Sequence, residues 1–141
     1  MNVSAYFARG VDFNEDGTFS VLRGGMNAYD LPKAPSVARS FFFFISVELD
    51  EGEIGTEHSV MLRVLNPDGT ENGTTPPTSF RVERKPDAPE MVPAYRYAID
   101  LYGMHLPSHG RYDFSVLVDG QVRRSVALYV APRGASPVED S

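Results

Sequence analysis

Apolar and polar residues alternate along most of this chain. Between positions 112 and 118, Tyr112, Phe114, Val116 and Val118 occupy every second position. Similar alternation marks the segments 3–13, 19–21, 41–49, 60–64, 80–82, 95–101 and 122–130. Because successive side chains of a strand point to opposite faces, this pattern predicts β-strands with one buried face.

The segment 95–101 permits a second interpretation, because Tyr95, Ala98, Ile99 and Tyr102 also recur at helical spacing. A strand is favoured, since the segment is rich in β-forming residues and a further strand follows it.

Three Asp-Gly pairs separate these segments, at positions 16–17, 68–69 and 119–120. Glycine adopts the positive φ that tight reversals require, so an Asp-Gly pair after an alternating segment predicts a hairpin. We expect positive φ at Gly17 and Gly120. The middle pair closes the sequence Asn66-Pro67-Asp68-Gly69, which suits a type I turn. Three such turns predict an all-β protein.

The apolar pattern also predicts the register of the two outer hairpins. A three-residue loop at 15–17 places Phe13 opposite Phe19, and one at 118–120 places Val116 opposite Val122. A two-residue loop would pair apolar with polar positions, because a slip of one residue turns every side chain to the other face. We therefore expect a bulged three-residue turn in both hairpins.

Together these features predict a single antiparallel β-sandwich of about seven or eight strands, with an immunoglobulin-like, Greek-key course, over residues 1–131. The segments 24–40, 71–79 and 84–93 are rich in Pro, Gly, Asn and Thr and are predicted to be loops. Residues 132–141 are predicted to form a disordered tail.

One stretch carries a family resemblance. Leu106-Pro107-Ser108-His109-Gly110-Arg111-Tyr112-Asp113-Phe114 follows the pattern L-P-x-x-G-x-Y-x-F, and a D-G turn and a strand ending in Leu128-Tyr129-Val130 come after it. This combination resembles the C-terminal half of an uncharacterised bacterial family of small immunoglobulin-like β-sandwich proteins, a domain of unknown function. Its G-x-Y-x-F part also resembles the tyrosine-corner strand of immunoglobulin-like domains. The resemblance implies the fold and a bacterial, cytoplasmic setting, and it brings no activity or site residues.

Four consecutive phenylalanines, Phe41 to Phe44, depart from the alternation. Phe41 and Phe43 fall on the core face, so Phe42 and Phe44 point to the other side. Leaving these rings in water forgoes roughly 25 cal/mol for each Å² of apolar surface. Either the segment 26–38 or a chain terminus covers them, or they form a protein–protein interface.

Composition and charge narrow the functional classes. The net charge of −6 disfavours nonspecific nucleic-acid binding, and the absence of cysteine excludes disulfides and Cys-based zinc sites. Residues 1–10 lack the pattern of a secretory signal, and the longest apolar run, 41–45, is far shorter than the ~20 residues of a membrane helix. We therefore expect a cytoplasmic protein without membrane, nucleic-acid or cofactor partners.

Asp12, Asn14, Asp16 and Gly17 match the opening D-x-N-x-D-G of a calcium-binding loop. The twelfth position of that loop should supply a bidentate glutamate, but here it is Arg23. The flanking segments also predict strands rather than helices. A hairpin turn with solvated acids is therefore favoured over calcium binding.

His105 and His109 are four residues apart, a spacing that places two zinc ligands on one face of a helix. Pro107 and Gly110 predict a turn instead, and His58 lies far away in the sequence. Solvated loop histidines are therefore favoured over a zinc site.

Charged residues gather in two short segments. Acidic residues surround the end of the 41–49 segment, namely Glu48, Asp50, Glu51, Glu53 and Glu57. Paired carboxylates could perform acid–base catalysis, although a solvated acidic loop is favoured. A short basic stretch, Arg81, Arg84 and Lys85, is predicted to keep an edge of the protein soluble.

The sequence thus predicts a non-catalytic binding or assembly module that acts through protein–protein contacts, with a protein partner or with further copies of itself. Phe42 and Phe44 are its possible interface. Two alternatives stay open: a carbohydrate- or calcium-binding β-sandwich module, and a hydrolase-like enzyme that uses the loop histidines and acidic residues. The sequence does not indicate a small-molecule ligand.

Overall fold

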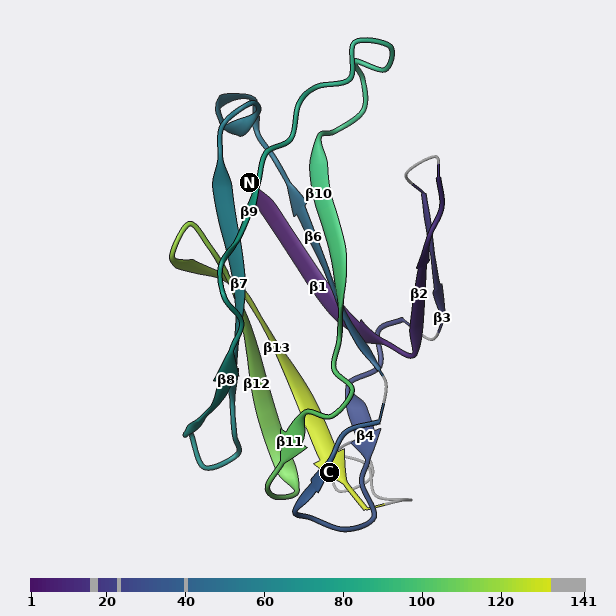
Figure 1. The fold of residues 1–141 in the computed structure, drawn as a ribbon, viewed down its shortest axis with the longest axis vertical. Helices are drawn as coiled ribbons and strands as arrows, with labels where there is room; N and C mark the ends of the chain where they lie inside the picture. Colours follow the sequence, from purple (N-terminus) through teal and green to yellow (C-terminus); the bar gives the residue numbers. More distant parts are fainter. Residues whose placement is uncertain (16–17, 23, 40, 133–141) are drawn as a thin grey trace.

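The computed structural model describes residues 1–15, 18–22, 24–39 and 41–132, and these form an all-β protein (Figure 1). Within these described residues, the helical structure is one 3-10 turn, η1 (Glu51–Glu53). The strands are β1 (Asn2–Ala8), β2 (Gly10–Phe13), β3 (Phe19–Leu22), β4 (Ala28–Asp30), β5 (Ser36–Val37), β6 (Phe42–Glu48), β7 (His58–Leu65), β8 (Glu71–Thr74), β9 (Thr78–Phe80), β10 (Ala94–Asp100), β11 (His105–Leu106), β12 (Gly110–Val118) and β13 (Gln121–Ala131). The all-β prediction is confirmed, as is a strand at 95–101.

Two larger sheets contain most of these strands. One has the order β1-β6-β10, and the other has the order β4-β13-β12-β7-β8, with β9 also paired to β7. Two small sheets, β2-β3 and β5-β11, lie outside them. The expected antiparallel arrangement of seven or eight strands is wrong in detail, because β4 runs parallel to β13 and the strands are more numerous.

The additional strands lie in segments that were predicted to be loops. The range 24–40 contains β4 and β5, and the range 71–79 contains β8 and the start of β9. These strands have two to four residues each, so they are too short to show an alternating pattern. They form because each can pair with a neighbouring strand, which the local sequence does not reveal.

Aromatic rings join the two larger sheets across a common core. Phe7 of β1 and Phe43 of β6 place their ring centroids 4.8 and 5.4 Å from that of Phe114 on β12. Tyr112, Phe114 and Val116 are fully buried, so the alternation identified the inward face of this strand correctly.

The first hairpin has the predicted register. Val11 pairs with Val21 and Phe13 with Phe19, and the Asn14 amide donates to the Thr18 carbonyl at 2.8 Å. Gly17, for which positive φ was expected, lies outside the described residues.

The hairpin between β12 and β13 keeps the predicted inward face of β12 but has neither the predicted loop nor the predicted pairing of Val116. Val118 pairs with Gln121, and Asp119 and Gly120 have φ of 52° and 80°, so the turn has two residues. A register shift next to Val116 supplies the extra residue, which lies in β13 as a bulge. The expected three-residue loop and the expected pairing of Val116 with Val122 are therefore wrong. Val116 pairs with Arg124, while Val122 pairs with Leu117 and is 51% exposed, because the bulge turns the first residues of β13 to the other face. The expected positive φ at Gly120 is confirmed.

Tyr112 forms the corner that its sequence motif suggests. Its buried hydroxyl donates to the Ser108 carbonyl at 2.7 Å and accepts the Ser108 amide at 3.2 Å. This contact ties the start of β12 to the preceding turn, as a tyrosine corner does.

No helix in the described ranges is long and apolar enough to cross a membrane. The predicted tail, apart from Pro132, lies outside the described residues.

Candidate functional site

Phe44 is covered by its own chain. Its side chain is 2% exposed, and its ring packs against Tyr6, Phe13 and Phe19, with centroids 5.0, 6.3 and 4.8 Å away. The β2–β3 hairpin supplies two of these rings, so this hairpin covers the outer face of the β1-β6-β10 sheet. Phe44 is therefore not an open interface residue. The rings that cover it come from β1 and the β2–β3 hairpin, rather than from the segment 26–38 or from a chain terminus alone. Phe42 is half-buried, and its role as an interface residue stays a prediction.

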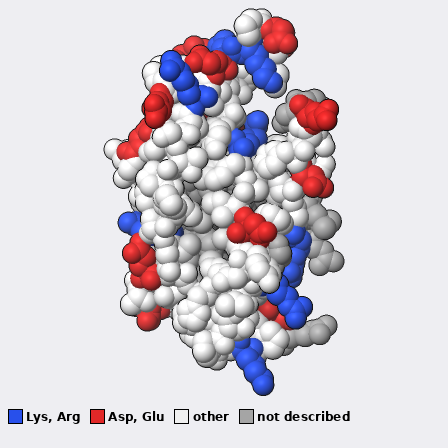
Figure 2. Space-filling view, in the orientation of Figure 1, with Lys and Arg blue, Asp and Glu red and all other residues white. Residues whose placement is uncertain are grey.

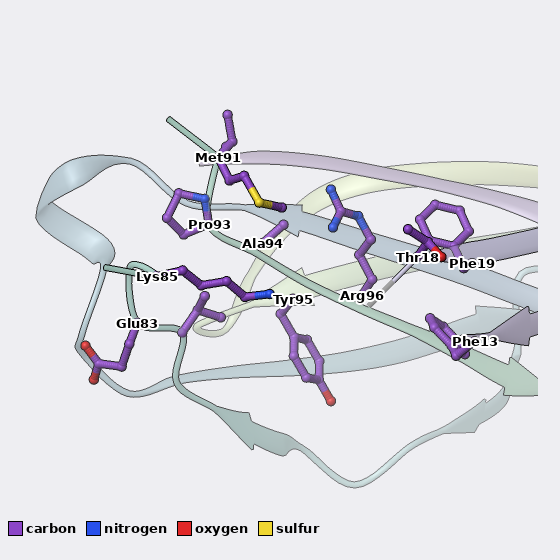
Figure 3. A pocket seen from close by; sticks show the side chains of 12 residues that line it. Phe13, Thr18, Phe19, Glu83, Lys85, Met91, Pro93, Ala94, Tyr95 and Arg96 are labelled. Atoms are coloured by element: carbon purple, nitrogen blue, oxygen red, sulfur yellow. The ribbon is translucent and has the colours of Figure 1, made fainter. Parts of the chain in front are cut away.

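A groove of about 600 Å³ opens between this hairpin and the first residues of β10 (Figure 3). The hairpin contributes Phe13 and Phe19, and the segment leading into β10 contributes Met91 and Val92. The β10 strand itself contributes Arg96. Figure 2 shows a notch in the molecular surface between the uppermost loop and the hairpin.

The groove contains an unusual share of exposed apolar surface. Phe13, Met91 and Val92 are 50, 53 and 56% exposed. Within the described residues, the other large exposed apolar side chains are Val37, Tyr102 and Val122, which do not line the groove. Half of the large exposed apolar residues therefore lie around one depression, whereas isolated ones are ordinary on protein surfaces.

Charged groups lie beside this apolar surface. The Arg96 guanidinium lies 5.8 Å from the centre of the Phe19 ring, a cation–π contact that orients it across the groove. Lys85 and Glu83 also line the groove, and Glu83 accepts a hydrogen bond from Arg81 at 3.0 Å. The groove can therefore contact apolar groups and an anionic group at the same time.

The opposite face of β10 is packed against aromatic side chains, and this fixes the wall of the groove. Tyr95 stacks on Phe80 with ring centroids 4.5 Å apart and lies 5.2 Å from Tyr97. Burial, with a smaller contribution from Tyr95, raises the pKa of Tyr97 to about 12. In Figure 3, Tyr95 and Arg96 accordingly point to opposite sides of the strand.

A second polar site, which the sequence did not reveal, joins His58 to Asp119. His58 Nδ1 lies 2.8 Å from Asp119 Oδ2, and its Nε2 lies 2.8 Å from the Glu53 carbonyl. The Asp119 hydrogen bond and then the Glu53 carbonyl raise the pKa of His58. Asp119 Oδ1 also accepts the Ser59 amide at 3.0 Å. This site ties the β12–β13 turn to β7, and its partners are 61 residues apart, so no local motif indicates it.

His105 and His109, which the zinc and hydrolase alternatives require, are held apart from each other's contacts. His109 Nε2 lies 2.7 Å from the Leu31 carbonyl, while His105 is exposed on β11. Among the described residues, no three His, Cys, Asp or Glu side chains lie close enough to hold a metal ion.

The predicted acidic loop makes structural contacts instead. Asp50 and Glu53 pair with the amino group of Met1, and Glu51 pairs with Arg84.

The calcium motif lies on the β2–β3 hairpin, so its flanks are strands, as expected. Asn14 donates its side-chain amide to the Thr18 hydroxyl at 2.9 Å. Asp16, Gly17 and Arg23 lie outside the described residues.

Comparison with known proteins finds a family but no function. Residues 4–131 match the family of unknown function DUF6941. Among solved structures, the chain is similar to an immunoglobulin-like protein from Pseudomonas aeruginosa, with 14% sequence identity over 92% of this chain and 95% of that chain and a TM-score of 0.45. No curated protein matches the chain.

Proposed function

The chain belongs to DUF6941, a family of unknown function, and for this member we propose a non-catalytic binding module that acts through protein–protein contacts at the groove beside the β2–β3 hairpin. The groove takes an extended segment of a partner protein. Apolar side chains of that segment contact Phe13, Met91 and Val92, and an acidic group contacts Arg96.

One observation carries this proposal: three large apolar side chains that are at least half exposed surround a single depression. A folded protein loses stabilisation when it leaves such surface in water, so a concentrated apolar site with polar groups at its margin is typical of an interaction surface. Strand β10 forms one wall of the groove and positions Arg96, and the β2 strand positions Phe13, while Met91 and Val92 lie in the segment just before β10.

The polar groups favour binding over hydrolysis. Glu83 is paired with Arg81, and Arg96 contacts the Phe19 ring, so these charges are positioned by neighbouring side chains. His109 contacts a backbone carbonyl rather than a carboxylate. A hydrolase would need a base aligned with a nucleophile or a water, and these contacts do not provide that alignment.

The proposal can be tested by selecting displayed random dodecapeptides on the immobilised protein and measuring the affinity of the enriched peptides by calorimetry. We expect the substitutions Phe13→Ser and Met91→Ser each to weaken binding by about tenfold, because each removes an apolar contact. Val122→Ser is the matched control, since Val122 is 51% exposed but lies outside the groove.

Equal binding of the enriched peptides by the groove variants and the wild-type protein would refute this assignment of the site. Failure to enrich any peptide would count against protein–protein contacts as the function of the groove.

A further inference from the structure

Among the residues that the structure describes, β10 is the last strand of its sheet, so one of its two edges has no partner strand there. Two backbone hydrogen bonds just beyond the ends of β10 and β6 show which residues of β10 face this edge. The Leu49 amide donates to the Pro93 carbonyl at 2.9 Å, and the Leu101 amide donates to the Phe41 carbonyl at 2.8 Å. Because hydrogen-bonded residues alternate along an antiparallel pair, odd-numbered residues of β10 bond to β6. The backbone groups of Ala94, Arg96 and Ala98 therefore point toward the open edge.

The side chains at the even positions form a self-complementary pattern. They lie on the outer face of the sheet, where Arg96 and Asp100 are both exposed and stand on either side of Ala98. A charge of each sign thus lies two residues from a small central residue. In Figure 2, the surface along β10 shows a basic patch near its upper end and an acidic patch near its lower end, with uncharged surface between them.

We propose that two copies of this chain associate through their β10 edges into a two-fold symmetric dimer with one continuous six-stranded sheet. The strands run antiparallel, and Ala98 lies opposite Ala98 of the partner subunit. Arg96 then lies opposite Asp100 of the partner subunit, and the two-fold axis repeats this ion pair. The alternation places Tyr97 opposite Ile99 of the partner subunit on the inner face.

Charge complementarity selects a second copy as the occupant of this edge. A strand added beside β10 needs an acidic residue opposite Arg96, a small residue opposite Ala98 and apolar residues opposite Tyr97. β10 itself has this sequence when it is turned through 180°. Asp100 can make the new contact while it keeps its contacts within its own chain, among them the hydrogen bond from the Tyr102 amide at 3.0 Å, because a carboxylate accepts several hydrogen bonds.

The dimer does not rest on the proposed function, although both proposals use Arg96: it contacts an acidic group of the peptide in one and Asp100 of the partner subunit in the other. Peptide binding in the groove is tested with Phe13 and Met91, which lie outside the proposed strand pairing. Either proposal can therefore fail while the other holds.

The test is the mass in solution, measured by sedimentation equilibrium and by light scattering. A monomer has 15.6 kDa, and we expect the wild-type protein to show twice that mass at high micromolar concentration. In a dimer of the Arg96→Asp variant, two acidic side chains face each other at both of the symmetric contacts. In a dimer of the Asp100→Arg variant, two arginines face each other at both contacts. Each single variant should therefore weaken the dimer by about tenfold or more.

The decisive measurement is a mixture of the two single variants. In a mixed dimer, both acids of one chain face both arginines of the other, so an equimolar mixture should restore the dimer. The double variant Arg96→Asp/Asp100→Arg should also dimerise, because it only exchanges the two charges. This recovery depends on the register through Ala98 and would not follow from a general effect of charge on solubility or folding.

Ala98→Pro provides a second, independent probe. The Ala98 amide points away from β6, so proline at this position removes a bond of the dimer without removing one from the sheet. We expect a monomer with an unchanged far-UV circular dichroism spectrum. A wild-type protein that stays monomeric at high concentration, or a dimer that both single reversals leave intact, would overturn the proposal.

Discussion

At the scale of single residues, the Tyr112 hydroxyl is the clearest case of a side chain that holds the backbone in place. It makes two hydrogen bonds to Ser108 and is buried. Tyr112→Phe leaves the Ser108 carbonyl without this donor, and we expect it to lower the free energy of unfolding by about 1–2 kcal/mol. Urea denaturation measures this loss.

Tyr102→Phe is the matched control for this substitution, because the Tyr102 side chain is 74% exposed and loses no buried contact. Equal stability of the Tyr112→Phe variant and the wild-type protein would show that the corner does not stabilise the fold.

His58 makes the stability of the protein dependent on pH. Both of its ring nitrogens face oxygen acceptors, and the Asp119 hydrogen bond is the main cause of its raised pKa. A folded-state pKa above the usual 6.5 means that folding favours the protonated ring. The stabilisation is then fully present below pH 6.5 and decreases as the pH rises through the folded-state value.

We therefore expect the free energy of unfolding to fall as the pH rises above about 6.5, and His58→Gln to reduce this slope. Denaturation at several pH values measures it. The amino group of Met1 also has a raised pKa, mainly through Asp50, so a part of the slope at higher pH should remain in the variant. An identical slope in both proteins would contradict the assignment to His58.

At the scale of elements, the β2–β3 hairpin depends on Phe44. Phe13 and Phe19 of the hairpin pack on this ring. Phe44→Ala should lower the free energy of unfolding by about 3 kcal/mol and accelerate amide hydrogen exchange in β2 and β3. Phe42→Ala is the control on the same strand and face. Because the Phe42 ring is only half-buried, its removal should lower the free energy of unfolding by less. A hairpin with unchanged exchange in the Phe44 variant would show that other contacts hold it.

The hairpins show how far local sequence determines register. The alternation in the first hairpin led to the observed pairing of Phe13 with Phe19. In the last hairpin the same argument gave the correct inward face but the wrong loop, because the extra residue lies in a bulge beside Val116. The apolar pattern shows which alternate residues of a strand face inward. The position of the extra residue depends instead on how β13 fits its neighbours.

At the scale of the whole molecule, the calcium motif offers a test of the hairpin interpretation. Asp12 lies within β2 and pairs with Ser20, and Asn14 follows this strand and donates its side-chain amide to the Thr18 hydroxyl. Because Arg23 occupies the position of the bidentate acid in the sequence, we expect millimolar calcium to leave the melting temperature unchanged. Scanning calorimetry with and without calcium measures this. An increase of several degrees would indicate a bound ion and restore the calcium-binding alternative.

The sequence by itself determined the all-β class, the long strands and the inward face of β12. These features depend on alternation within single segments, and burial of Phe114 against Phe7 and Phe43 follows from it. The resemblance at residues 106–130 likewise indicated a family of unknown function, which the match over residues 4–131 confirms.

Only the tertiary structure decided the cover over Phe44, the groove and the pairing of His58 with Asp119. Each of these depends on contacts between segments that are far apart in the chain, as the 61 residues between His58 and Asp119 illustrate. The pattern within a segment shows which side chains need a partner. It does not show which distant segment supplies that partner, because this depends on how the sheets and the hairpin pack together.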